Sequence, residues 1–421
     1  MANHYNVWSG YGLKASPFFN QPLEPDPGHP TRPITLFLGR DEETRLITNR
    51  VMGGGSSVSL VTGKYGVGKT TFLHHMEYEL GQDGSVYVPP APVRLTSSTS
   101  PEALGAEVLR RLVGAVDQVD ILRGMKRSRV YKEADRTVNI LDRVTGSISV
   151  LGIGGGMGRT ADVPPFPIHD TITLAHELAS RIQRERPEQK ILMHLDNLEN
   201  VYDPTDPSPA WRMFRDVRDL LQLDGVHFLM AGGSDFYRSV IQKEEKVSDV
   251  VGMPVILHPL HEDTAWQVLE ARIQFLSREY GGGRTPITPE AFHALHEAYG
   301  GNLRGMFGLA ETIFQARPPR EFDPMGWEDL IPPARDVATN HLRSMVSGKD
   351  IEYLQVVYDG FAAGEFRQKE LTGLFDLTQP SLSRALDRWS KQRLVEIVRE
   401  EPPSRYFRLS GLVLIGFGWN P

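Results

Sequence analysis

The feature that most constrains this chain is the nonapeptide Gly63 to Thr71, which reads Gly-Lys-Tyr-Gly-Val-Gly-Lys-Thr-Thr. It fits the pattern G-x-x-x-x-G-K-[ST] of a loop whose backbone N–H groups wrap around a phosphate. An apolar run, Val58 to Val61, precedes the loop, and a helical pattern from Thr70 to Leu80 follows it. Strand, loop and helix in this order suit phosphate binding, because the helix N-terminus adds positive potential. The alternative is a chance glycine turn before a helix.

The residue types in this loop predict individual roles. Lys69 would reach the β- and γ-phosphates of a nucleotide, and the Thr70 hydroxyl would hold Mg²⁺. The predicted nucleotide-binding residues of the loop are Gly63, Gly66, Val67, Gly68, Lys69, Thr70 and Thr71.

Apolar segments alternate with helical ones through the first half of the chain. Ile191–Asp196, Val226–Ala231 and Val255–Leu257 read as buried strands. Two shorter segments, Val86–Val88 and Val93–Leu95, indicate one interrupted strand. Strands separated by helices predict an α/β fold with a parallel sheet that is covered on both faces.

A carboxylate, Asp196, ends the first of these buried strands. Beside a phosphate-binding loop this position reaches Mg²⁺, so we predict Asp196 as a metal ligand together with Thr70; a strand-end aspartate in a turn is the alternative. Many P-loop ATPases have next a glutamate that activates water, but Asn197 carries an amide without basicity. Either Glu199 replaces that base, or hydrolysis is slow and the protein acts as a nucleotide-controlled switch.

Three further residues occupy positions that suit nucleotide chemistry. Ser234 follows the strand Val226–Ala231 and can orient water against the γ-phosphate, although a strand-ending turn explains it equally well. Arg238 is either an arginine finger for a neighbouring subunit or a surface arginine. Arg304 opens a helix after Gly300-Gly301-Asn302-Leu303, where it can fold over the γ-phosphate; a capped helix start with a solvated arginine is the alternative.

Composition limits the remaining classes of function. The length of 421 residues suggests about two to four domains. The net charge of −7 gives no global basic signal, so any nucleic-acid contact requires a local patch. The absence of cysteine excludes disulfides, thiolate metal sites and cysteine nucleophiles. Without a signal-peptide core or an apolar run of membrane-spanning length, we expect no membrane contact and a cytoplasmic protein.

The sequence predicts four domains. They are an extended N-terminal arm (1–35), a P-loop ATPase core (36–257), a helical lid with a linker (258–335) and a winged helix domain (336–421). We expect part of the arm to dock through Phe18 and Phe19 rather than to remain a disordered tail. Pro318-Pro319 and Pro332-Pro333 are expected to flank the linker.

An insertion in the core spans residues 117–163. Six basic residues gather on one predicted helical stretch: Arg123, Lys126, Arg127, Arg129, Lys132 and Arg136. Ser147–Leu151 then alternates into a glycine-rich stretch, which predicts a short hairpin or a mobile loop. The insertion is either a surface for partner proteins or a solvated face with a floppy loop.

The C-terminal segment predicts a winged helix. Ile351–Ala362, Gln368–Leu374 and Thr378–Trp389 read as helices, and Leu394–Val398 and Tyr406–Leu409 as a β-hairpin wing. The third helix has an apolar face of Leu382, Ala385, Leu386 and Trp389. The predicted DNA-binding residues, suited to base edges and phosphates, are Gln379, Ser381, Ser383, Arg384, Arg388 and Arg405. Because this segment holds as many acidic as basic residues, a winged helix used only for protein contacts is the alternative.

Together these segments resemble the AAA+ ATPases of the initiator type, which are the origin-recognition ATPases and their bacterial and mobile-element relatives. The matching pieces are Gly12-Leu13 with Pro17-Phe18, Phe37 to Glu42, the P-loop, Leu195-Asp196, Pro259-Leu260, Gly301-Asn302-Leu303-Arg304 and the winged helix. The resemblance implies ATP and Mg²⁺ as cofactors and a nucleotide between the sheet and the helical lid. It places Phe37, Leu38, Gly39 and Arg40 beside the adenine.

The resemblance also implies a function. It indicates an ATP-dependent, DNA-associated ATPase of replication initiation, transposition, mobile elements or defence, which binds DNA through the winged helix. Homo-oligomers or partner proteins would use the ATPase surface and the insertion. The alternative is a signalling switch of the related STAND class, whose winged helix contacts only protein. A metabolic P-loop kinase is disfavoured, because a lid and a winged helix would have no purpose there.

Overall fold

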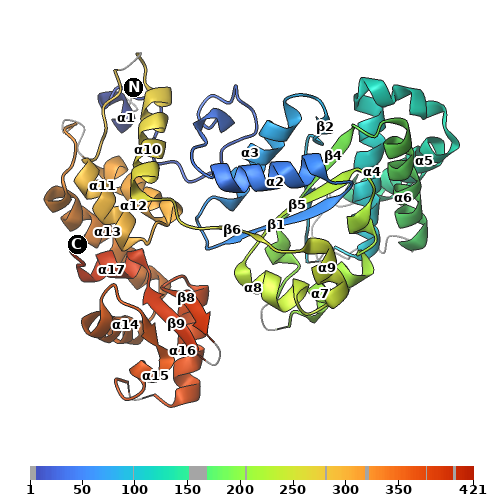
Figure 1. The fold of residues 1–421 in the computed structure, drawn as a ribbon. Coiled ribbons are helices and arrows are strands. Elements are labelled where there is room, and N and C mark those ends of the chain that lie inside the picture. Colours follow the sequence, from blue (N-terminus) through green and yellow to red (C-terminus); the bar gives the residue numbers. More distant parts are fainter. Residues whose placement is uncertain are drawn as a thin grey trace. The chain divides into compact units, whose positions relative to one another are not determined.

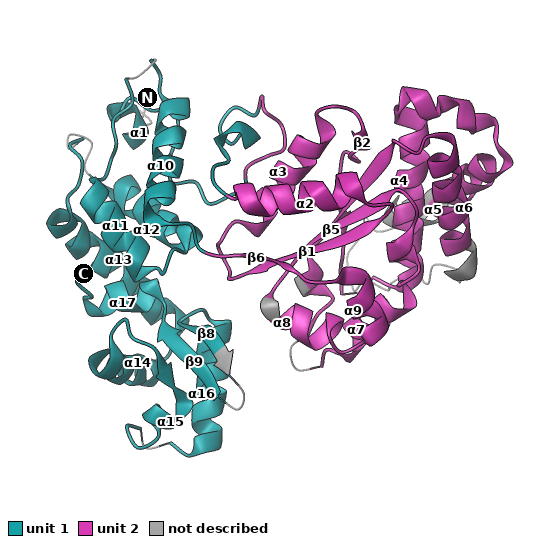
Figure 2. Cartoon of the chain, viewed as in Figure 1, with its two compact units in different colours: residues 1–22, 29–39, 259–421 teal, residues 23–28, 40–258 magenta. Residues whose placement is uncertain are grey.

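The computed structural model contains two compact units, which Figure 2 colours separately. Unit 1 joins residues 1–22, 29–39 and 259–421, and unit 2 comprises residues 23–28 and 40–258. The structure describes residues 6–97, 99–150, 168–203, 206–279, 282–317, 322–375, 377–401 and 404–421. None of the helices in these ranges combines the length and the apolar character that a membrane span requires.

Unit 2 is built on a parallel sheet with the strand order β2-β4-β5-β1-β6 (Figure 1). The strands of this sheet are β1 Ser57–Gly63, β2 Val86–Tyr87, β3 Val93–Arg94, β4 Lys190–Asp196, β5 Val226–Gly232 and β6 Val255–Leu257. Both β2 and β3 pair with β4, at Ile191 and Leu195 respectively, so the prediction of one interrupted strand is confirmed. The central strands are buried along nearly their whole length, as continuous apolar runs require.

Helices cover both faces of this sheet. Figure 1 shows α2 and α3 above the strands and α7, α8 and α9 below them. The helical elements of unit 2 are α2 Asp41–Gly53, α3 Lys69–Gly81, α4 Pro101–Gln118, η2 Asp120–Arg127, α5 Arg129–Val150, α6 Ile168–Glu185, η3 Leu198–Asn200, α7 Ser208–Asp216, η4 Leu220–Gln222, α8 Ser234–Phe236, η5 Tyr237–Ile241 and α9 Glu245–Val251. The predicted doubly covered parallel sheet is therefore confirmed.

The predicted insertion is helical as far as the structure describes it. Tyr131, Ala134 and Val138 of α5 are buried at helical spacing, and the Tyr131 hydroxyl donates to Asp117 at 2.8 Å. The expected hairpin at Ser147–Val150 is wrong, because α5 continues through these residues. A running helix adds each further residue at little cost, which outweighs a short local alternation. The glycine-rich part of this prediction, residues 151–163, lies outside the described residues.

Part of the basic stretch in this insertion is neutralised by neighbouring acids. Three ion pairs are Arg123 with Asp120 at 2.8 Å, Lys126 with Asp117 at 2.6 Å and Arg129 with Glu133 at 3.9 Å. The stretch is thus less cationic than its sequence suggests.

Unit 1 is mainly helical. Its elements are α1 Val7–Gly10, η1 Ile34–Leu36, α10 Glu262–Leu276, α11 Pro289–Ala298, α12 Leu303–Ala316, α13 Trp327–Met345, α14 Gly348–Phe361, β7 Phe366–Arg367, α15 Gln368–Leu371, α16 Gln379–Lys391, β8 Val395–Glu401, β9 Ser404–Leu409 and α17 Gly411–Phe417. The N-terminal arm docks within this unit, since Phe18 is buried and stacks on Phe314 of α12 with ring centroids 5.5 Å apart. The prediction of a docked arm is confirmed.

The prediction of a linker that ends at Pro332-Pro333 is wrong. These prolines lie in the second turn of α13, which runs without a break from Trp327 to Met345. Two prolines remove two backbone donors, but burial of Leu330, Ala334, Ala338 and Leu342 along one face stabilises the helix around them. The predicted domain boundary at residue 336 therefore falls inside a continuous helix.

The C-terminal part of unit 1 combines α14, α15 and α16 with an antiparallel sheet in the order β7-β9-β8. Strands β8 and β9 form a hairpin, with Val395 opposite Leu409 and Glu401 opposite Ser404, so the predicted hairpin is confirmed. The predicted apolar face of α16 is also confirmed, because all four of its residues are buried: Leu382, Ala385, Leu386 and Trp389.

Candidate nucleotide site

The phosphate-binding loop connects β1 to α3, as the motif predicts. Gly63 has φ 153°, and a Cβ atom there would lie 2.5 Å from the Leu257 carbonyl oxygen of β6, so only glycine fits. Gly68 has φ 93° and forms the N-cap of α3. A Cβ at Gly68 would meet no atom within 4 Å, so the space beside this glycine is open. Its left-handed backbone, rather than crowding, is what favours glycine at the start of α3.

The Lys69 side chain folds back onto this loop. Its Nζ donates to the carbonyl oxygens of Gly63, at 2.8 Å, and Lys64, at 3.0 Å. Thr70 and Thr71 follow it in the first turn of α3, and both are half-buried. Phe72 donates the first helical hydrogen bond, to Gly68 at 2.9 Å, and the amides before it face the loop.

The strand register brings further predicted residues to the same edge of the sheet. Because β1, β5 and β4 are parallel neighbours, their carboxyl ends lie side by side. Thr62 pairs with Gly232 and Leu195 pairs with Met230, so Asp196 and the start of α8 at Ser234 lie at the edge that carries the P-loop. This edge is where ligands bind in open α/β sheets.

A tight turn follows Asp196. The Asp196 carboxylate accepts a hydrogen bond from the backbone N–H of Asn197 at 2.9 Å. Asn197 has φ 64°, in the left-handed region. Asparagine tolerates this conformation better than glutamate does, which explains an amide where a catalytic acid was expected. Asn200 holds the turn by donating to the Leu95 carbonyl at 3.1 Å. The backbone places Glu199 in η3, two residues after Asn197.

The remaining candidates of unit 2 have different surroundings. The Ser234 backbone begins α8. Arg238 bonds Asp235 at 2.8 Å and is 43% exposed, an arrangement typical of a surface arginine. Arg40 is the N-cap of α2 with φ 75°, and its guanidinium donates to the P-loop carbonyl of Val67 at 3.4 Å. Burial lowers the pKa of Arg40, and its partner Glu43, 3.5 Å away, partly offsets that effect.

The predicted residues around Arg40 divide between the two units. Phe37, Leu38 and Gly39 belong to unit 1, whereas Arg40 belongs to unit 2. Leu38 is 36% exposed, and Gly39 takes φ 74°. The segment thus contains one of the chain connections between the units.

Arg304 lies where the motif places it, in the first turn of α12. The Asn302 side chain caps this helix by accepting from the Gly305 amide at 3.1 Å, and Gly301 takes φ 76°. Arg304 is exposed. The helix start therefore has the predicted geometry.

The predicted DNA-contacting residues have unequal surroundings. Gln379, Arg384, Arg388 and Arg405 are exposed, and Ser381 and Ser383 are half-buried. Arg384 donates to the Pro380 carbonyl at 3.3 Å and stays on the surface of α16. Arg405 lies 3.7 Å from Asp387, and Arg388 is bonded to Asp350. The two last arginines thus have acidic partners within the unit.

Asp350 is a residue that the sequence did not single out. It accepts from the Trp389 indole at 2.9 Å and from Arg388, and it bonds the Ser347 hydroxyl at 2.7 Å. Burial raises the pKa of this carboxyl, but the hydrogen bonds from Ser347, Trp389 and Arg388 outweigh it and lower the pKa. Asp350 joins α14 to α16. The Ser-x-x-Asp pattern at the start of α14 was the only sequence signal for it.

No protein-family model matches the chain, and no curated protein matches it. A Walker-type ATPase of Pyrococcus abyssi is similar in structure, with a TM-score of 0.51 and 10% identity over 95% of this chain and 99% of that one.

Two origin-recognition proteins of Aeropyrum pernix are also structural neighbours. ORC2 has a TM-score of 0.48 and 13% identity over 95% of this chain and 96% of that one. ORC1, solved in complex with DNA, has a TM-score of 0.43 and 14% identity over 91% of this chain and 93% of that one.

The strand order, the loop from β1 to α3 and the Pyrococcus abyssi ATPase define the class of fold. The chain has the fold of a P-loop ATPase of the AAA+ type. Its structural neighbours include the origin-recognition ATPases that the sequence resembles.

Proposed function

We propose that this protein is an ATP-binding, DNA-associated ATPase that acts as a nucleotide-controlled switch. The observation that carries the proposal is the single sheet edge shared by the P-loop and Asp196. The Walker-type fold supports it.

The site fits a nucleoside triphosphate. Gly63 and Gly68 give the loop a conformation that other residues avoid, and the helix N-terminus favours an anion. Lys69 now bonds two neutral carbonyl oxygens, and phosphate oxygens are stronger acceptors for its ammonium group. Lys69 would therefore bind the β- and γ-phosphates, while the amides from Gly66 to Thr71 cradle them.

The site also fits Mg²⁺. The Thr70 hydroxyl and the Asp196 carboxylate are oxygen donors, which Mg²⁺ prefers, and both belong to the elements that meet at this edge. When bound, the ion neutralises phosphate charge. In the wider AAA+ arrangement Arg304 would contact the γ-phosphate, Phe37 to Arg40 would border the adenine, and Arg238 would serve a neighbouring subunit.

Hydrolysis would be slow. Asn197 cannot accept a proton, and its left-handed backbone suits a turn rather than a catalytic acid. Ser234 is the proposed water-orienting residue. Glu199 is the alternative base, and with Glu199 in that role hydrolysis would not be slow. A site that binds ATP well and hydrolyses it slowly holds its bound state for long, which suits a switch.

DNA would bind through the C-terminal helices and hairpin, acting as a winged helix. Arg384 is the main proposed phosphate contact, with Gln379, Ser381 and Ser383 beside it on α16. Arg388 and Arg405 contribute less, because Asp350 and Asp387 balance their charge. The same ion pairs favour a second candidate, a STAND-like signalling switch whose winged helix contacts only protein.

Equilibrium binding of a fluorescent ATP analogue with Mg²⁺ tests the nucleotide site. The wild-type chain should bind it, and Lys69→Ala should bind it at least about 100-fold more weakly because a charge-assisted contact to two phosphates is lost. Lys64→Ala is the matched control, because Lys64 lies in the same loop and is exposed. Equal affinity of the wild-type chain and Lys69→Ala would refute the site.

A further inference from the structure

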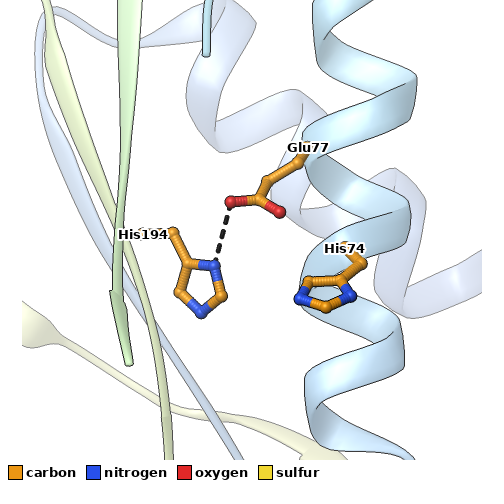
Figure 3. A group of neighbouring side chains, drawn as sticks. All are labelled: His74, Glu77 and His194. Carbon is orange, nitrogen blue, oxygen red and sulfur yellow. Dashed lines mark hydrogen bonds and ion pairs between the residues drawn. The ribbon is translucent and has the colours of Figure 1, made fainter. Parts of the chain in front are cut away.

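A second cluster of polar side chains lies in unit 2, between α3 and β4. It consists of His74 and Glu77 from α3 and His194 from β4, and we refer to it as the His74 cluster. Figure 3 shows the two α3 side chains projecting toward His194 on the strand. His74 and Glu77 are three residues apart, so they share one face of the helix. The nucleotide function does not use these residues.

The three side chains offer one ligand atom each, and these atoms lie within 4.8 Å of one another. Glu77 Oε1 is 2.9 Å from His194 Nδ1, and both side chains are buried, with 9% and 2% exposure. His194 Nε2 is buried with no hydrogen-bond partner. A buried polar atom without a hydrogen bond indicates a missing partner, because an unsatisfied buried donor or acceptor is unfavourable.

His74 has the environment of a ligand histidine. Its Nδ1 lies 2.6 Å from the Leu23 carbonyl oxygen. A carbonyl only accepts, so Nδ1 carries the proton and Nε2 carries the lone pair. Histidines that bind metals commonly donate their other ring N–H to a backbone carbonyl, which fixes the tautomer. His194 Nδ1 contacts Glu77 Oε1, so His194 Nε2 and the second Glu77 oxygen remain for an ion.

We propose that the His74 cluster binds one divalent transition-metal ion of the Zn²⁺ class. Two imidazoles and one carboxylate suit zinc, whereas Mg²⁺ and Ca²⁺ prefer oxygen donors alone. A cation would also balance the negative charge of a buried carboxylate. His74 is half-buried, so the cluster is not fully enclosed, and zinc would take water as its fourth ligand.

The bound ion would connect two elements of the nucleotide site. Helix α3 begins at Lys69, and β4 ends at Asp196, two residues after His194. An ion between them fixes the phosphate-binding helix against the strand that carries the proposed Mg²⁺ ligand. The proposal stands independently of nucleotide binding, because it depends on donor chemistry alone.

Zinc titration of the untagged, full-length, chelator-stripped chain tests this proposal. Excess Mg²⁺ and ADP are present, so that oxygen-donor sites are already occupied. The wild-type chain should bind about one Zn²⁺ tightly, as a chain without cysteine can do through imidazole and carboxylate ligands. Zinc should also raise its melting temperature, because binding to the folded state stabilises it.

Single substitutions locate the ion. His74→Gln, Glu77→Gln and His194→Gln should each weaken zinc binding by more than about 100-fold, since loss of an outer partner alone typically costs about 10–100-fold. His75→Gln is the matched control, because His75 is the adjacent residue of α3 and lies outside the cluster. It should retain zinc as the wild-type chain does.

Two outcomes would overturn the proposal: a wild-type chain that takes up no zinc, or cluster variants that bind zinc as well as His75→Gln does. If the cluster variants do not fold by circular dichroism, zinc X-ray absorption of the wild-type chain decides. Two imidazole ligands per zinc support the site, and fewer overturn it. ATP-analogue binding, measured on the same samples, reports separately on the nucleotide site.

Discussion

Two arginines of α16, four residues apart, should respond differently to the same substitution. Arg388 bonds Asp350, which also holds Trp389 and Ser347, whereas Arg384 contacts only the Pro380 carbonyl among the hydrogen bonds described for it. Arg388→Ala should therefore destabilise the fold. Arg384→Ala should leave stability unchanged and weaken DNA binding.

The structure sets the size of both effects. A hydrogen bond to a charged group contributes roughly 1.5–3 kcal/mol, and exposed ion pairs contribute at most about 1 kcal/mol. Arg388 is 50% exposed and Asp350 13%, so the expected loss of unfolding free energy for Arg388→Ala lies between these, at about 1–1.5 kcal/mol. If Arg384 contacts one phosphate, its removal should reduce the slope of log affinity against log salt by about 0.9.

Urea unfolding and DNA anisotropy in a salt series measure the two quantities on the same variants. The account predicts a lower urea midpoint only for Arg388→Ala and a salt slope that Arg384→Ala reduces more than Arg388→Ala does. An Arg388→Ala chain with wild-type stability and a salt slope reduced like that of Arg384→Ala would refute the reasoning. Arg388 would then contact DNA, as the sequence pattern predicted.

Three other predictions concern catalysis, the arm and pH. Asn197→Glu should raise ATP turnover if the missing base limits it; an unchanged rate, with an inactive Glu199→Gln, would assign the base to Glu199. Arg272 is half-buried, with its guanidinium 3.9 Å from the centre of the Phe19 ring and its pKa lowered by burial to about 9, and it donates to the arm carbonyls of Pro17 and Phe19. Arg272→Met should therefore speed proteolysis of the arm; equal cleavage rates would contradict this. Asp350 has a lowered pKa despite burial, so its carboxylate stabilises the fold above the unfolded pKa of about 3.9, and this contribution disappears as pH falls through the folded value. Lowering the pH should therefore reduce the difference in unfolding free energy between the wild-type chain and Asp350→Asn. A difference that does not change with pH would count against this role of Asp350.

The elements that local pattern determines were predictable from the sequence. The P-loop follows β1 and opens α3 because its glycines allow conformations that other residues avoid. The apolar face of α16 follows from helical spacing, and the β8-β9 hairpin follows from two short strand patterns that lie close together in the sequence. Both kinds of signal depend on neighbours in the chain.

The features that depend on distant partners were not predictable. Pro332 and Pro333 looked like a break, but burial of one face of α13 stabilises the helix around them. Arg388 looked like a DNA contact because nothing near it in the sequence reveals Asp350, which comes from another helix. The His74 cluster likewise needs α3 and β4, which are far apart in the chain.

Asn197 illustrates a third case. The pattern marked it as a departure from the expected acid, and the structure explains it by a left-handed turn after Asp196. The side-chain identity thus reflects backbone geometry as well as chemistry. Because the turn favours an asparagine where a catalytic acid would stand, slow hydrolysis and a switch form one proposal.

DNA binding by fluorescence anisotropy, with and without ATP and across a salt series, tests the central claim most directly. The account predicts affinity that rises with ATP and Mg²⁺, falls steeply with salt because phosphate contacts release counterions, and loses its ATP dependence in Lys69→Ala. No DNA binding under any of these conditions would contradict it. The C-terminal helices and hairpin would then serve protein contacts, and the signalling switch would be the better account.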